Sequence, residues 1–170
     1  MAILQPRRSS PPAAYSPSSA GSLVRCHAMF DAATKSDSAG VAAFVLMDDS
    51  GDLRMAKAHQ YVGIGDPYVL EALALRDCLN ECLSRQLRNV IIGEDAKVII
   101  DKCCNKDTSD ARIGALLQEI MLLLVDLGDA KVVFVGRNRN RVAHFVARRA
   151  LSLSPSYLKG FDFVSWFNSR

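Results

Sequence analysis

The hydrophobic pattern of this chain begins with three short apolar runs, over residues 24–31, 40–47 and 53–61, each of which predicts a β-strand. The second and third runs are joined by Asp48-Asp49-Ser50-Gly51, a polar sequence typical of a turn. Such a turn folds one strand back onto the next. We therefore expect the second and third strands to form an antiparallel hairpin.

From residue 68 to about residue 85 the apolar positions recur with the period of a helix. Glu71, Leu75, Cys78 and Cys82 are spaced by four, three and four residues, so they share one helix face. Glu71 thus begins the buried stripe of its own helix. A surface salt bridge is a poor explanation for a carboxylate in that position.

The second half of the chain alternates between strands and helices. The pattern predicts strands over 89–95 and 131–135, and helices over 96–104, 112–127 and 138–151. The resulting order is βββαβααβα, in which an antiparallel hairpin precedes a partly parallel sheet. The predicted fold class is therefore α/β, with a mixed five-stranded sheet flanked by helices.

Composition sets the domain organisation. With 170 residues and 49% hydrophobic content, the chain suffices for one domain with a real core, which we place at residues 23–155. Residues 1–22 are rich in Pro, Ser and Ala and lack acids, which is typical of a disordered leader or, less so, of a transit peptide. Residues 156–170 form a C-terminal tail that contains several aromatic residues. No apolar run reaches transmembrane length.

The five cysteines are odd in number and show no paired Cys-x-x-Cys, which argues against a disulfide framework and against zinc. The net charge of +3 at pH 7 is mild, but its distribution is uneven. No acid occurs between Ala130 and Phe161, a stretch with seven basic residues: Lys131, Arg137, Arg139, Arg141, Arg148, Arg149 and Lys159. This basic region fits a phosphate backbone or an ordinary solvated helix face, and the sequence leaves both open.

Three carboxylates lie inside or at the end of apolar runs: Asp31, Glu71 and Asp95. A lone carboxylate among buried residues carries a large desolvation cost unless a cation meets it. Acids from three separate elements that converge on one site would bind a hard divalent cation such as Mg²⁺. The alternatives are buried hydrogen-bonded carboxylates, or a charge near a helix N-terminus in the case of Glu71.

Four local motifs in this order resemble the ribonuclease H fold. The resemblance covers residues 24–155 and is closest to the plant reverse-transcriptase-like ribonuclease H domains that derive from retroelements. The motifs are Phe30-Asp31-Ala32-Ala33, Glu71-Ala72-Leu73-Ala74-Leu75, Asp95-Ala96-Lys97-Val98-Ile99-Ile100 and Arg137-Asn138-Arg139-Asn140-Arg141-Val142-Ala143-His144-Phe145-Val146-Ala147.

The resemblance implies that Asp31, Glu71 and Asp95 match the first three acids of a catalytic site that binds two Mg²⁺ (or Mn²⁺) ions. Paired metals of this kind clamp both oxygens of an in-line displacement at phosphorus. His144 stands where these enzymes usually carry a fourth Asp, although many plant members also have His there. His144 is therefore either a proton-transfer residue or a helix-face histidine hydrogen-bonded to a neighbour, because imidazole is a poor ligand for Mg²⁺.

Two further departures concern the surroundings of the site. His27-Ala28-Met29-Phe30-Asp31 replaces the Lys-x-Asn-x-Asp often found in the family, and the loop before Asn140 lacks the usual Gly-His pair. Arg137, Arg139 and Arg141 are expected to contact a phosphate backbone, and Asn140 to bind nucleic acid or to form a helix cap or another local hydrogen bond.

The resemblance thus implies an enzyme that hydrolyses the RNA strand of RNA–DNA hybrids. The alternative is a domesticated domain that binds nucleic acid or a protein partner without cutting, and a purely structural role leaves the three acids unexplained. We further expect a monomer without membrane association, located inside the cell in the nucleus or cytoplasm, with a plastid also compatible with residues 1–22.

Overall fold

The computed structural model describes residues 25–36 and 38–170. The predicted leader over residues 1–22 and the predicted start of the first strand at Val24 lie outside these described residues. Among the described helices, none is both long and apolar enough to cross a membrane.

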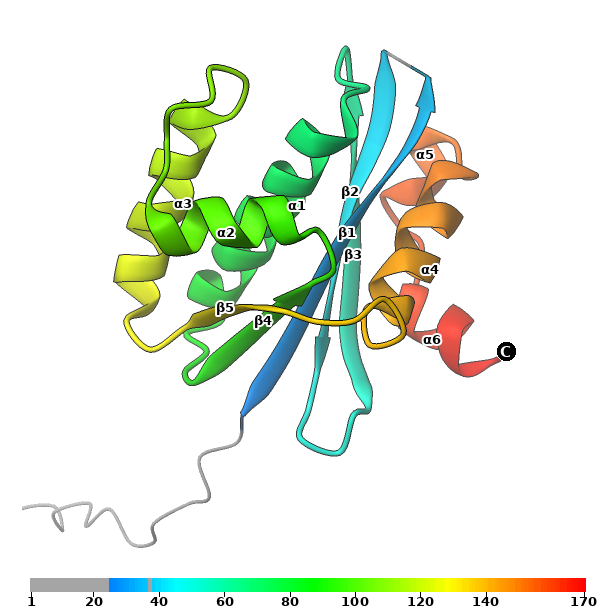
Figure 1. The fold of residues 1–170 in the computed structure, drawn as a ribbon. Helices are drawn as coiled ribbons and strands as arrows, with labels where there is room; N and C mark the ends of the chain where they lie inside the picture. The colour runs from blue at the N-terminus through cyan, green and yellow to red at the C-terminus, as the bar shows by residue number, and fades with distance from the viewer. Residues whose placement is uncertain (1–24, 37) are drawn as a thin grey trace, which may run out of the picture.

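The centre of the molecule is a five-stranded mixed sheet in the order β3-β2-β1-β4-β5 (Figure 1). The strands are β1 (Cys26–Ser36), β2 (Ala39–Met47), β3 (Leu53–Val62), β4 (Val90–Glu94) and β5 (Lys131–Phe134). The first three pair antiparallel, whereas β4 pairs parallel with both β1 and β5. The predicted hairpin and the predicted mixed five-stranded sheet are confirmed.

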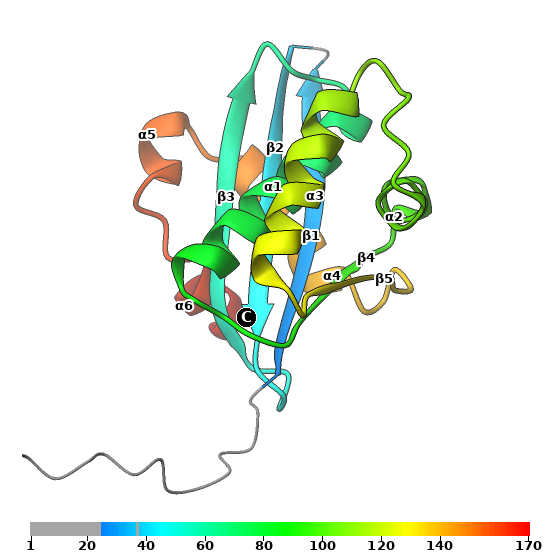
Figure 2. The same cartoon turned by 90° about the vertical axis from the view of Figure 1, so that its left-hand side faces the viewer.

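Helices cover both faces of this sheet (Figures 1 and 2). They are α1 (Pro67–Ser84), α2 (Lys97–Asn105), α3 (Gly114–Leu127), α4 (Arg141–Leu151), α5 (Pro155–Leu158) and α6 (Phe163–Asn168). Helix α1 packs on β1 and β2, and α3 lies on the outer side of α1. Helix α4 packs on β1, β2 and β3 from the opposite face of the sheet. The predicted order βββαβααβα is therefore confirmed, and two short helices, α5 and α6, extend it through the predicted tail.

Strand alternation divides the core into two clusters. Phe30 and Phe44 point into the cluster under α1, whereas Met29 and Val45 point into the cluster under α4. Two fully covered faces explain why β2 is apolar at nearly every position. The sheet is thus a central layer, and anything that joins its two sides has to pass around a strand end.

The start of α1 is fixed by its own sequence. The Asp66 side chain accepts a hydrogen bond from the Tyr68 backbone N–H at 3.0 Å, and Pro67 occupies the first helical position. These two features determine where the helix begins, and they place Glu71 just past its first turn.

The first strand is longer than predicted. It continues to Ser36, because residues after Asp31 keep pairing with β2 as far as Ser36↔Ala39. Its pairing with β4 ends earlier, at Met29↔Gly93. Asp31 therefore lies in the middle of β1 and not at its end, on a section of the strand whose β4 side is open. This open section is where the functional site lies.

Candidate metal centre and nucleic-acid interface

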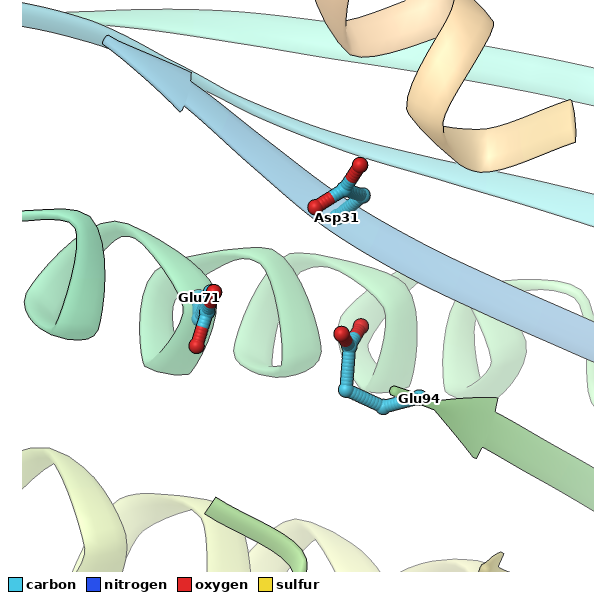
Figure 3. A group of neighbouring side chains, drawn as sticks. All are labelled: Asp31, Glu71 and Glu94. Atoms are coloured by element: carbon cyan, nitrogen blue, oxygen red, sulfur yellow. The ribbon is translucent and has the colours of Figure 1, made fainter. Parts of the chain in front are cut away.

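Three carboxylates meet where β4 stops beside β1. Asp31 comes from β1, Glu71 from α1, and Glu94 is the last residue of β4 (Figure 3). One oxygen from each of them lies within 4.8 Å of the others. Asp31 lies on a strand of the sheet and Glu71 on α1, which packs on one face of it, and the end of β4 at this point leaves room for the two side chains to approach. The arrangement offers converging oxygen ligands of the kind that hard divalent cations prefer.

The charges of these carboxylates are poorly compensated. No described Lys or Arg forms an ion pair with Asp31, Glu71 or Glu94, and the Glu71 side chain accepts no hydrogen bond from a described residue. Burial, together with the nearby charges of Asp31 and Asp95, raises the pKa of Glu71 to about 7.

Glu94 is fully buried, and Asp31 nearly so. Burial and a hydrogen bond shared with Asp95 raise the pKa of Glu94 to about 10. Burial also raises the pKa of Asp31, although the N–H of Ala32 and the ring of His144 act in the opposite direction. A divalent cation between these groups would favour their charged forms, because metal binding displaces protons from its ligands.

Asp95, the third metal ligand predicted from the sequence, is not part of the converging set. Its Oδ1 accepts a hydrogen bond from Asn140 Nδ2 at 3.1 Å, and its Oδ2 accepts one from Arg137 Nε at 3.4 Å. Burial alone would raise the pKa of Asp95, but the hydrogen bonds from Glu94, Asn140 and Arg137 lower it. Asp95 therefore lies beside Glu94 at the edge of the cluster, and Glu94 supplies the third converging oxygen.

Asn140 connects three elements of the site. Its Nδ2 donates to the Phe30 carbonyl at 2.9 Å and lies 3.4 Å and 3.5 Å from the two Glu94 oxygens, in addition to its bond with Asp95. The Phe30 carbonyl belongs to the part of β1 just beyond its pairing with β4.

The side chain of Asn140 forms no helix cap. The residue is only 1% exposed, which leaves its side chain no surface for direct contact with nucleic acid. Its position instead makes it a local hydrogen-bonding residue, the other alternative that the sequence allowed, because it fixes the carboxylates next to it.

His144 lies one turn further along α4, and its backbone N–H donates to the Asn140 carbonyl. Its Nδ1 is 2.8 Å from Asp31 Oδ2. About half of the His144 side chain is exposed. The helix therefore contributes a hydrogen bond to Asp31 at this point and no additional negative charge.

The predicted phosphate-binding arginines lie before and at the start of α4. The side chain of Arg137 is 94% exposed and is paired with Asp95. Arg139 and Arg141 are exposed, and neither forms an ion pair with a described residue. Their charges thus remain available to an anion near the carboxylates.

Sequence patterns did not identify Glu94 because it directly precedes Asp95, and the motif favours the second of two adjacent acids. One signal was present: Glu94 ends the apolar run 90–94, and a strand residue at an even spacing from Val90 and Ile92 points to the same buried side.

The fold and the carboxylate cluster together define a ribonuclease H-like protein. The chain belongs to the reverse transcriptase-like family, which matches residues 29–150. No curated protein matches this sequence.

Several solved structures share the fold. Ribonuclease H1 from the halophilic archaeon Halobacterium salinarum is 21% identical with a TM-score of 0.68, over 75% of this chain and 97% of that one. The N-terminal RNase H domain of a Mycobacterium tuberculosis protein is 14% identical with a TM-score of 0.68, over 75% and 94%. LC11-RNase H1 in complex with an RNA/DNA hybrid is 16% identical with a TM-score of 0.64, over 75% and 99%.

Proposed function

We propose that this protein hydrolyses the RNA strand of RNA–DNA hybrids with two divalent cations, Mg²⁺ or Mn²⁺. The observation that carries this proposal is the convergence of Asp31, Glu71 and Glu94 oxygens within 4.8 Å without an ion pair to any Lys or Arg among the described residues. Support comes from LC11-RNase H1, a protein of the same fold that was solved with an RNA/DNA hybrid.

The donor set fits such ions, because it consists of carboxylate oxygens. Asp31, Glu71 and Glu94 would hold them, with Asp95 beside them at the edge of the cluster. When bound, the cations supply a hydroxide nucleophile and stabilise the attacking and leaving oxygens. Discrimination between RNA and DNA would rest on contacts to 2′-hydroxyl groups in the wide minor groove of the hybrid.

The surrounding residues orient the cluster. His144 holds Asp31 from α4, and Asn140 joins the Phe30 carbonyl of β1 to Asp95, which directly follows β4, so the acids at the two strands keep a fixed spacing. Arg139 and Arg141 add positive charge where the phosphate backbone would approach. Because hydrogen bonds fix His144 and Asn140 against the acids before substrate arrives, little reorganisation of the cluster is needed on binding.

A second function is favoured by His144 and Arg137. His144 forms a hydrogen bond with an oxygen of Asp31, and Arg137 donates one to an oxygen of Asp95. Each of these contacts competes with a metal ion for that oxygen. On this ground the alternative is a domesticated domain that binds nucleic acid, or a protein partner, without cutting it.

As part of the same proposal, the protein acts as a monomer inside the cell, in the nucleus, cytoplasm or a plastid, and its domain derives from a plant retroelement.

Cleavage of a labelled RNA–DNA hybrid with Mg²⁺ or Mn²⁺ tests the enzymatic function, with Asp95→Asn and Glu71→Gln as comparisons. We expect metal-dependent RNA cleavage that both substitutions reduce. Hybrid binding without any cleavage in either metal would favour the alternative.

A further inference from the structure

A groove of about 880 Å³ lies on the α4 side of the sheet, between the hairpin end of β1 and β2 and the helix itself. Its sheet side includes Ala33 and Val41, which belong to the cluster under α4. The polar lining residues on which the following argument depends are Thr34, Lys35, His144, Arg148, Ser152 and Ser154. Hydroxyl groups and two basic side chains thus surround a space with a largely apolar floor.

The charge of this groove is positive. Lys35 and Arg148 form no ion pair with any described residue, and no Asp or Glu is among the residues that line the groove. The hydroxyl of Ser154 can donate a hydrogen bond to an oxygen atom, whereas the hydroxyl of Ser152 donates to the Arg149 carbonyl. An anionic ligand with several oxygen acceptors therefore fits this lining better than a neutral or cationic one.

The groove is continuous with the carboxylate cluster. His144 lines the groove and at the same time lies 2.8 Å from Asp31. Arg148 follows one turn later on the same helix, and Ser152 and Ser154 follow its end. Arg137 and Arg139 precede the helix, so basic residues lie on both sides of His144 along the chain.

We propose that this groove holds the sugar–phosphate backbone of the cleaved strand next to the reacting phosphate, with Lys35 and Arg148 neutralising its phosphates. This proposal rests on the proposed function, because it takes the carboxylate cluster as the reaction site. The strand would then pass from the Arg137–Arg141 segment, across the carboxylates, and into the groove beside β1.

The first test is a Lys35→Ala/Arg148→Ala double variant, with binding to a labelled hybrid measured in an Asp31→Asn background that prevents cutting. We expect at least about 10-fold weaker binding, and a log–log salt slope lower by roughly 0.9 for each lost phosphate contact. The control is Arg88→Ala/Lys131→Ala, which removes the same number of positive charges near the N-terminal ends of β4 and β5, whereas Glu94 lies at the C-terminal end of β4. Equal effects of the two double variants would overturn the proposal.

The second test locates the contact. It uses a series of hybrids, each with one neutral methylphosphonate linkage at a different position. Hybrids with the neutral linkage on one side of the cleavage position should bind the wild-type protein more weakly than the unmodified hybrid does. The Lys35→Ala/Arg148→Ala variant should show no additional loss at those linkages. If the variant is still as sensitive to those linkages as the wild-type protein, the groove does not hold the strand. The same conclusion follows if the variant binds inorganic phosphate more weakly but binds the hybrid as tightly as the wild-type protein does.

These outcomes are separate from those of the proposed function. Cleavage by the wild-type protein with unchanged binding by the double variant would overturn the groove alone. Absence of cleavage in the wild-type protein, together with the expected binding loss in the double variant, would overturn the enzymatic function and leave the groove as a strand-binding site.

Discussion

The Asp31 carboxylate is held from two directions at once. It accepts a hydrogen bond from the Ala32 N–H at 2.8 Å and contacts His144 Nδ1 at 2.8 Å. Asp31→Asn keeps the shape of the side chain and removes its charge, so we expect hybrid cleavage to be abolished while the fold persists. Cleavage assays and thermal unfolding of the metal-free protein check this, and undiminished cutting would reject the assignment of Asp31.

Glu94 makes metal-free stability depend on pH. Its pKa rises from 4.5 to about 10 on folding, so the folded chain binds more protons than the unfolded chain between these values. Metal-free stability should therefore fall as pH rises through this window, by at most about 1.4 kcal/mol per pH unit for this residue. Glu71 adds to the fall up to about pH 7.

Glu94→Gln should reduce this slope and raise metal-free stability near neutral pH, because Glu94 must take up a proton when the chain folds at that pH, whereas a neutral amide needs none. Urea unfolding with a chelator at several pH values between about 5 and 8 measures both effects. Glu119→Gln, at an exposed position of α3, serves as the control. Identical pH slopes in the wild-type protein and in Glu94→Gln would contradict the prediction.

At the scale of the elements, the segment that leads into α4 carries the arginines nearest the cluster. A triple Arg137→Ala/Arg139→Ala/Arg141→Ala variant should bind a labelled hybrid more weakly. Its log–log salt slope should be lower by roughly 0.9 for each lost phosphate contact on a duplex. Titrations at several salt concentrations measure this. An unchanged slope and affinity would leave these residues as surface charge and would favour a protein partner.

The last helix, α6, is attached to the domain through aromatic packing. Phe163 is 3% exposed, its ring lies 4.8 Å from that of Phe161, and the Arg149 guanidinium lies 5.2 Å from the Phe161 ring. Phe163→Ala should lower the free energy of unfolding by about 3–5 kcal/mol. Tyr157→Ala, at a residue that is 73% exposed, should change it by no more than about 0.5 kcal/mol.

Denaturant unfolding of these two variants also tests the predicted domain boundary at residue 155. If Phe163→Ala is as mild as Tyr157→Ala, residues 156–170 are an appendage, as the sequence pattern suggested. A large loss in Phe163→Ala alone would extend the folding unit through α6.

At the scale of the whole molecule, the sequence predicted the architecture well because period and turn chemistry are local properties. The hairpin around Asp48–Gly51 and the stripe that begins at Glu71 are examples. The end of β1 was wrong because strand pairing with β2 continues past Asp31. The roles of Glu94 and Asn140 depend on where β4 stops beside β1, and no local pattern encodes that contact.

The convergence of the three carboxylates where β4 ends beside β1 also determines how the whole protein should respond to divalent cations. In the folded chain, burial and mutual repulsion disfavour the charged forms of Asp31, Glu71 and Glu94, whereas in the unfolded chain these groups are far apart and solvated. A cation that binds only the folded protein raises its stability by RT ln(1 + [L]/Kd), or about 2.7 kcal/mol at 100-fold excess over Kd. Millimolar Mn²⁺ or Mg²⁺ should therefore raise the melting temperature, as measured by calorimetry without nucleic acid.

A Glu71→Gln variant separates this specific effect from a general influence of salt. The variant should already be more stable than the wild-type protein without metal, because one of the mutually repelling charges is gone. It should gain little from Mn²⁺, since one converging oxygen has become a weaker amide ligand. If NaCl at matched ionic strength raises the wild-type melting temperature as much as Mn²⁺ does, or if Glu71→Gln responds to Mn²⁺ like the wild-type protein, these carboxylates do not form the metal site.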